Sequence, residues 1–387
     1  MGKELNNKTY FAIKVLTPLN IGAGQENDWM ENVDFVTDKK YLYKFNLRRL
    51  MHDFGDVVSS KVGTKGLYSA IGSNNLPNYS QIFKRPTDAS RNPIFCQNPV
   101  KTIAKNNLTG NPIIAGSSLK GAIRSVLYQY FDVKRQKEND VFGTAKNGDD
   151  FMRFVKISDA EFGETKLINT KIFNLWNDGN SWCGGWKHGS NNTNEHFKSD
   201  GFNTIYECIP TQNEGYVSIM LSPAAYNIFG KYHQHIKNEL KQPILEKGIT
   251  KLFDIINNHT REYLKKECAF FKTYSQAEYA DEIIASIDDL IGQIPTDNNS
   301  CILKMSAGSG FHSITGDWQL PTYSINGLDT SKRVSRGMYN NDKSAKSRKI
   351  ADTDDGLMLM GFVKLTKITE DEYCQWNIIE DSLQKLK

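Results

Sequence analysis

Hydrophobic residues recur at every second position near the start of the chain, which is the pattern of a half-buried strand. In the segment 9–24 (TYFAIKVLTPLNIGAG), Phe11, Ile13 and Val15 alternate with other side chains, and a proline and the GAG triplet end the pattern. A second alternating segment, 32–46 (NVDFVTDKKYLYKFN), has the polar sequence TDKK at its centre and predicts a hairpin. A short helix is predicted directly afterwards, over LRRLMHDF.

Periodicity is lost between about residue 55 and residue 112. This stretch contains LPNYSQIFKRPTDASRNPIFCQNP, with four prolines and many Asn and Ser residues. Such a length is unusual for an ordinary connection between two elements. We therefore expect an insertion at about 55–112 that is either a functional excursion or partly disordered.

A helical period returns in the segment 113–127 (IIAGSSLKGAIRSVL) and continues beyond it. Its apolar residues recur at spacings of three and four, and Ser117 or Ser118 is a natural N-cap. We predict a helix here, with Leu119, Ile123 and Leu127 on its buried side.

Strand and helix patterns are mixed through the rest of the chain. Strands are predicted within 154–175 and around the turn TQNEG, helices at 244–268 and 279–291, a strand entering a glycine-rich loop at 301–316, and a buried strand at 356–366. Because the strand signals are antiparallel in both halves, the pattern predicts an α+β fold rather than a βαβ alternation.

The length of 387 residues allows two domains of ordinary size. We place the boundary near the end of a Gly- and Asn-rich segment, 177–201. The expected domains are therefore 1–200, which carries the insertion at about 55–112, and 201–387. Hydrophobic residues make up 39% of the chain and charged residues 24%, as in soluble globular proteins that bury a sizeable core.

Charge and cysteine content exclude several classes of protein. The net charge of +4 permits a nucleic-acid partner without arguing for one. The six cysteines form no C-x-x-C pair, so neither a disulfide scaffold nor a zinc framework is expected. The start of the sequence has no apolar signal region, and no apolar stretch approaches the length of a membrane span. We expect a cytoplasmic protein with no membrane partner.

The motif GSSLKGAIR is not a nucleotide-binding loop. In a P-loop the lysine follows the second glycine and a hydroxyl residue follows the lysine, whereas here Lys120 precedes Gly121. G-x-G-x-x-G is absent as well. No cofactor is therefore expected, and no group of histidines and cysteines has a metal-ligand spacing.

The same motif suits a phosphate backbone. A helix start presents free N–H groups and a partial positive charge. Gly116 would let a ligand approach the backbone, and Ser117 and Ser118 add hydroxyl donors. Lys120 and Arg124 are four residues apart and share one helix face. The alternative interpretation is a capped helix with two solvated basic residues.

His312, in GSGFHS, is the histidine with the most chemical interest. It could act as a general base on RNA, or it could lie against RNA and orient a loop. Cleavage would need a partner acid or a second histidine, and the sequence offers none. No catalytic residue is therefore predicted.

A basic segment covers residues 331–350. Asp342 is the only acidic residue in this segment, and its seven cations are Lys332, Arg333, Arg336, Lys343, Lys346, Arg348 and Lys349. The positive charge of this segment alone is larger than the net charge of the whole chain. We interpret it as a contact to a nucleic-acid backbone, with a solvated loop as the alternative.

Several of these segments together resemble the RAMP proteins of CRISPR systems. They are LTPLNIGAG (16–24), VDFVTDKKYLYKFNLRRL, AGSSLKGAIR (115–124) and KMSAGSGFHSITG (304–316). Ala115 stands where the family often has proline. The length and the order of the segments are similar to the subunits that cap the Csm complex of type III-A systems.

This resemblance implies two ferredoxin-like (RRM-like) domains with glycine-rich loops and a role in antiviral defence. The expected partners are the 3′ region of the CRISPR RNA, target RNA and neighbouring backbone subunits. It further implies support for 3′ trimming by host nucleases, and no cutting of the target. The implied RNA-facing positions are Gly22, Gly24, Gly116, Ser117, Ser118, Lys120, Gly121, Arg124, Gly308, Ser309 and Gly310. From their charge and position we add His312, Lys332, Arg333 and Arg336.

Two points stay open at this stage. One is a RAMP-type endoribonuclease that processes repeat RNA by metal-independent acid–base chemistry, for which His312 would be the only candidate. The other is the insertion, which resembles the thumb-like element that backbone subunits lay across a neighbour. Its apolar residues Ile82 and Phe83 beside Lys84 and Arg85 suit ordering against RNA and a partner. A flexible surface loop is the alternative.

Overall fold

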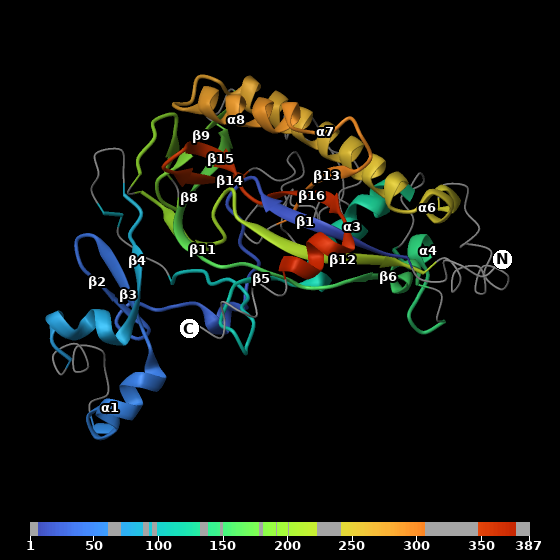
Figure 1. The fold of residues 1–387 in the computed structure, drawn as a ribbon. Helices are drawn as coiled ribbons and strands as arrows, with labels where there is room; N and C mark the ends of the chain where they lie inside the picture. The colour runs from blue at the N-terminus through green and yellow to red at the C-terminus, as the bar shows by residue number, and fades with distance from the viewer. Residues whose placement is uncertain are drawn as a thin grey trace.

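A computed structural model describes most of the chain. The described residues are 7–60, 71–87, 93–94, 99–131, 138–147, 150–177, 181–190, 192–199, 201–222, 241–305 and 347–376. They form two large antiparallel sheets, a smaller three-stranded sheet and several helices (Figure 1). The predicted mixture of helices with antiparallel strands is confirmed.

A five-stranded sheet lies at the centre of the molecule, in the order β13-β16-β1-β12-β6. Its strands are β1 (Asn7–Val15), β6 (Val155–Ile157), β12 (Glu214–Leu221), β13 (Ser300–Lys304) and β16 (Phe362–Ile368), and all neighbours are antiparallel. The alternation predicted for β1 is confirmed, because Phe11, Ile13 and Val15 are fully buried on one face. We call this the inner face and the opposite one the outer face.

Two helices cover the inner face. The predicted helix is confirmed as α3 (Gly116–Phe131), and α7 (Ile249–Thr273) lies beside it. The ring centroids of Phe11 and Phe253 are 5.2 Å apart, in the largest hydrophobic core of the molecule. Burial of this apolar area is the main stabilising contribution to the sheet.

A six-stranded sheet packs against the other end of α7. Its strands are β8 (Lys166–Asn177), β9 (Trp182–Lys187), β10 (Thr193–Asn194), β11 (Asn203–Cys208), β14 (Ser347–Thr353) and β15 (Gly356–Leu359). Helix α8 (Ala280–Gly292) and the second half of α7 form its core. Figure 1 shows α7 and α8 running along the same side of both sheets. A single helix, α7, therefore contributes to two cores.

Neither large sheet divides at residue 200, where we expected a change of domain. β1 pairs with β12 and β16, and β8 pairs with β14, so both sheets combine strands from the two halves of the chain. The segment interpreted as a breaker, 177–201, also contributes β9 and β10. Hydrogen bonding between distant strands, rather than local composition, decides which segments belong together.

A smaller unit projects from the six-stranded sheet, at the lower left of Figure 1, and its residues Phe35, Leu42 and Phe83 share a small core with Leu167 and Ile205 of that sheet. We call it the projecting unit. It comprises β2 (Phe35–Thr37), β3 (Tyr41–Phe45), α1 (Leu47–Ser60), the 3-10 helix η2 (Ser73–Tyr79) and β4 (Ser80–Lys84). The predicted hairpin is confirmed by the β2–β3 pairing. The loss of periodicity after residue 55 does not mean a loss of regular structure in this part of the insertion, because β4 pairs with β3.

Two further sequence interpretations are corrected at the C-terminal end. Arg348 and Lys349, assigned to a nucleic-acid contact, lie in β14, and Arg348 is buried with its Nε 2.7 Å from Glu267 Oε2. The strand predicted at 356–366 is two strands, β15 and β16, because the chain turns at Gly361, which has a φ of 87°.

The shorter elements complete the description. They are η1 (Gln25–Asn27), β5 (Ile113–Ile114), α4 (Glu138–Phe142), η3 (Phe151–Phe154), β7 (Ala160–Glu161) and α6 (Gln242–Lys247). Residues 370–376, directly after β16, are helical, and we call them the C-terminal helix. Within the described residues, no helix is long and apolar enough to cross a membrane.

Candidate nucleic-acid interface

The fold brings the first glycine loop close to the start of α3. The backbone N–H of Ala104 donates to the Ile21 carbonyl at 2.7 Å, and the Ile113 N–H donates to the Ala104 carbonyl at 2.9 Å. Gly22 forms an isolated bridge with Ile103 in the same arrangement. Two strand spacings, roughly 10 Å, therefore separate the loop from the segment that enters α3.

The start of α3 is packed against the protein rather than open to a ligand. The Gly116 N–H donates to Asp159 Oδ1 at 2.7 Å, so Asp159, and neither predicted serine, caps the helix. A Cβ at Gly116 would lie 2.3 Å from the Ile157 carbonyl oxygen. The glycine is needed for close packing of α3 on β6, which corrects our argument that it admits a ligand. Ser117 is exposed at the same helix end.

Lys120 and Arg124 share one face of α3, as predicted, but they are not freely solvated. Arg124 Nη1 lies 3.3 Å from Asp150 Oδ1, and its guanidinium is 4.1 Å from the ring centroid of Phe142. Burial lowers the pKa of Lys120, and Arg124 lowers it further, while Asp150 acts in the opposite direction. The two cations are therefore half-buried and held in place.

Gly121 lies on the same helix but on its open side. A Cβ built at this position would have no atom within 4 Å. Nothing in the described residues therefore requires a glycine here, and its lack of a side chain leaves room for an external group to approach α3.

A polar cleft of about 930 Å³ is lined by residues of the projecting unit and of the neighbouring segments 23–29 and 102–107. Its cations are Lys44, Arg49 and Lys105, its acids are Glu26, Asp28, Asp34 and Glu207, and its lining also includes Asn27, Asn46, Asn78, Asn107, Ser80 and Gln81. Ala23, between Gly22 and Gly24, is part of the same wall. Gly24 has a φ of 101°, so the loop itself depends on glycine. Cations and amides at one wall suit an extended polar ligand.

Trp29 closes this cleft and does not offer a free ring. It is 6% exposed, and the Nζ atoms of Lys44 and Lys105 lie 5.0 and 5.3 Å from its centroid. Burial lowers the pKa of Lys44, and Lys105 adds to this effect, while Asp34 and Glu207 oppose it. Trp29 therefore orients two lysines toward the cleft by cation–π contacts, instead of stacking on a base.

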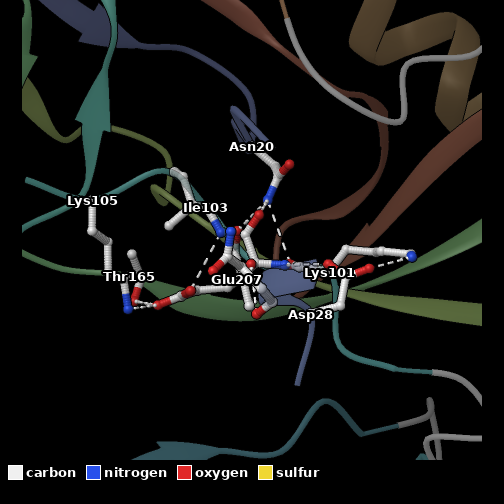
Figure 2. A network of polar contacts seen from close by, with 9 residues as sticks. Asn20, Asp28, Lys101, Ile103, Lys105, Thr165 and Glu207 are labelled. Carbon is white, nitrogen blue, oxygen red and sulfur yellow. Dashed lines mark hydrogen bonds and ion pairs between the residues drawn. The ribbon is translucent and has the colours of Figure 1, made fainter. Parts of the chain in front are cut away.

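A buried carboxylate fixes the wall that carries the glycine loop (Figure 2). Glu207 is fully buried, and its Oε1 accepts a hydrogen bond from Thr165 Oγ at 2.9 Å and lies 2.6 Å from Lys105 Nζ. Asn20 Nδ2 donates to the Glu207 carbonyl at 2.7 Å and to the Thr102 carbonyl at 3.1 Å. A buried charge is tolerated because it is paired in this way.

Sequence reasoning missed this network. The available signals were Glu207, an acid inside the apolar strand NTIYECI, and Asn20, a lone amide inside LTPLNIG. A polar side chain at an otherwise buried position requires a partner, although the sequence does not say which one.

Seven predicted RNA-facing residues lie outside the described residues. They are Gly308, Ser309, Gly310, His312, Lys332, Arg333 and Arg336. Among the residues that are described, no group of three or more His, Cys, Asp or Glu side chains could hold a metal ion.

Comparison with known proteins gives a family and a fold. The sequence model of the RAMP superfamily matches residues 12–294. A chain in a cryo-EM structure of a Csm–crRNA–target RNA ternary complex from a type III-A CRISPR-Cas system has a similar fold, with a TM-score of 0.57 and 18% identity over 92% of this chain and 100% of that chain. Csm5 of T. onnurineus gives a TM-score of 0.55 and 17% identity over 91% and 99%. No curated protein is significantly similar in sequence.

Proposed function

The chain belongs to the RAMP superfamily, and from that premise we propose that it is a non-catalytic, RNA-binding subunit that caps the Csm effector complex of a type III-A CRISPR system. It binds the 3′ region of the CRISPR RNA, adjoins the backbone subunits and target RNA, and supports 3′ trimming by host nucleases during guide maturation. The observation that carries the proposal is that the glycine loop borders a cleft with three cations and is joined through Ala104 to the segment that enters α3.

The strand order supports a ferredoxin-like assignment for the central sheet. The four strands β16-β1-β12-β6, with α3 following β1 and α7 following β12, have the order of a βαββαβ unit. We assign this unit as one RAMP domain, and the six-stranded sheet with α8 as the core of the second. The proposed domains therefore share α7 and interleave along the chain.

The projecting unit is proposed to contact a neighbouring subunit, in the role of the thumb-like insertion. Large apolar side chains are exposed on it, a feature typical of protein interfaces. They are Tyr41, Leu47, Met51 and Ile82, which are 41 to 62% exposed, and Met30 and Val33, directly before β2, are exposed to a similar extent. Its removal is expected to spare the strand pairing of the two large sheets, which involves none of its strands, and to expose Leu167 and Ile205 of the six-stranded sheet.

The RNA-binding proposal is tested by removing cations from the cleft and from α3. The Arg49→Gln/Lys120→Gln variant should bind single-stranded guide RNA more weakly, and its log–log salt slope should fall by about 1.4, since each lost phosphate contact removes about 0.7. The matched control, Lys198→Gln/Lys265→Gln, removes the same charge from exposed positions elsewhere. Equal affinities and slopes for the two variants would exclude this surface.

The absence of catalysis is tested with labelled repeat RNA. We expect the purified protein to leave it intact with and without divalent metal. Cleavage that disappears in His312→Ala would instead support the endoribonuclease alternative.

A further inference from the structure

The outer face of the five-stranded sheet carries two tyrosines on its central strands. Tyr10 lies on β1 and Tyr216 on β12, opposite in direction to the buried Phe11 and Val217. The register pairs Ala12 with Tyr216 and Tyr10 with Ser218, so the two tyrosines are diagonal neighbours. Diagonal neighbours are about 7–8 Å apart, which allows the two rings to form one continuous surface.

Lysines surround these rings. Lys8 and Lys14 follow the same side of β1, and Lys364 of β16 pairs directly with Lys14. Lys156 of β6 continues the row that starts at Lys8. Like charges opposite one another destabilise a sheet, so this arrangement is suited to a ligand of the opposite charge. The acid that faces them from the sheet is Glu214, whose Oε1 lies 3.9 Å from Lys14 Nζ.

The C-terminal helix covers the two tyrosines with rings of its own. The centroids of Tyr373 and Tyr10 are 4.6 Å apart, and Trp376 stacks on Tyr216 at 4.6 Å with an interplanar angle of 28°. Lys8 Nζ lies 5.1 Å from the Tyr10 centroid and 5.9 Å from that of Tyr373. The cover is therefore formed by two aromatic rings within reach of a cation.

The same helix supplies negative charge. The Tyr10 hydroxyl donates a hydrogen bond to Glu370 Oε1 at 2.6 Å, and Asp371 and Glu372 follow in sequence. Glu372 is used within the helix as the second half of a capping box with Thr369. Stacked rings combined with carboxylates above a basic surface reproduce the chemistry of single-stranded nucleic acid, in which bases stack and phosphates carry the charge.

The described part of the cover, residues 370–376, makes few contacts with the sheet. Apart from the half-buried Tyr373 and Trp376, its side chains are exposed. Within the described residues, the helix touches the sheet through the two ring pairs, the Tyr10–Glu370 hydrogen bond and the Lys8–Tyr373 contact, and a ligand with stacking rings and negative charge can make the same kinds of contact.

We propose that the outer face of the five-stranded sheet is a stacking platform for two nucleotides of single-stranded RNA, and that the C-terminal helix occupies it as a displaceable mimic of that RNA. The choice of RNA as the ligand rests on the proposed function. The site is separate from the cleft, since none of its residues lines that cavity.

The experiment removes the two covering rings in the full-length chain. Tyr373→Ala/Trp376→Ala should bind a labelled single-stranded RNA of mixed sequence at least about tenfold more tightly than the wild type, because two base–ring contacts become available. Adding Tyr10→Ala/Tyr216→Ala should abolish the gain, whereas adding Tyr10→Phe/Tyr216→Phe should keep it, since the phenyl ring still stacks. Tyr279→Ala, which removes an exposed ring beside α8, is the matched control and should change nothing.

The outcomes separate this inference from the proposed function. If the wild type binds guide RNA but removal of the cover leaves its affinity unchanged, or if the gain survives loss of Tyr10 and Tyr216, the platform is refuted and the proposed function stands. If neither the wild type nor the uncovered chain binds RNA, both are refuted. Ultraviolet cross-linking gives an independent readout: the uncovered chain should be labelled on the peptides that contain Tyr10 or Tyr216, and labelling confined to other peptides would refute the platform.

Discussion

The inner and outer faces of the five-stranded sheet differ in the kind of cover that they have. On the inner face, α3 and the 25-residue α7 bury Phe11, Ile13 and Val15 completely. On the outer face, the helical residues 370–376 lie on Tyr10 and Tyr216 through two ring contacts. Both faces belong to the same strands, and successive side chains of a strand point to opposite faces. Neighbouring residues of β1 therefore contact a permanent cover on one face and an exchangeable cover on the other.

The largest expected difference between the faces is in stability. Phe253→Ala on the inner side should lower the free energy of unfolding by about 3–5 kcal/mol, because it empties a fully buried position beside Phe11. Trp376→Ala on the outer side should cost only about 1 kcal/mol, the value of one aromatic pair. Chemical denaturation of both variants measures the two values. Similar losses would show that the outer cover is as structural as the inner one.

A smaller difference in stability is expected between alanine substitutions of two glycines in α3. Gly116→Ala should destabilise the protein by about 2 kcal/mol, because its Cβ would collide with the Ile157 carbonyl oxygen. Gly121→Ala should stabilise the isolated protein by about 0.5–1 kcal/mol, because alanine favours the helix and meets no neighbour.

The same pair also tests the binding surface on α3. If RNA approaches the open side of the helix, Gly121→Ala should weaken guide RNA binding in spite of its higher melting temperature. Gly292→Ala, at the end of α8 and likewise with no atom within 4 Å of the added Cβ, is the matched control. Undiminished binding by the Gly121 variant would remove this position from the interface.

The smallest effect concerns the pH dependence of the outer cover. The hydrogen bond to Glu370 raises the pKa of Tyr10 to about 12 from a model-peptide value of 10.0, with lesser contributions from burial and from the Glu370 charge. Since the folded-state pKa is raised, the contribution of Tyr10 to holding the helix is complete below pH 10 and is lost as the pH rises through about 12.

Difference absorbance of tyrosinate, wild type minus Tyr10→Phe, reports this ionisation directly. Glu370→Gln should move the transition back toward pH 10, because the carboxylate that accepts the hydrogen bond is gone. A transition near pH 10 in the wild type would show that the helix does not engage Tyr10 in solution.

Local sequence patterns predicted the individual helices and strands better than they predicted which strands pair with one another. The alternation of β1, the β2–β3 hairpin and the helices α3, α7 and α8 could all be read from short segments, because each depends on residues a few positions apart. The pairing of β1 with β12 and β16 could not, since it depends on segments hundreds of residues away. The expected boundary at residue 200 failed to match the sheets for this reason.

Charged residues show the same limit at the candidate site. The sequence pattern assigned Arg348 to a basic segment that contacts nucleic acid, whereas it is buried beside Glu267 and lies over the Phe270 ring. Gly116 was identified correctly as part of a specific motif, but the sequence does not show that Asp159 and Ile157 occupy the space around it. Motif spacing identifies which residues are special, and only tertiary contacts decide whether they serve packing or binding.

The position of β1 between β12 and β16 has a consequence for folding while the protein is being synthesised on the ribosome. β1 ends at residue 15 and its second neighbour, β16, begins at residue 362, so the two strands are translated roughly 20–70 s apart at ordinary elongation rates. Until then β1 has at least one unpaired edge, the kind of edge that invites aggregation. We expect nascent chains to need chaperone protection throughout synthesis, and a chain that stops before residue 362 to leave its central sheet unfinished.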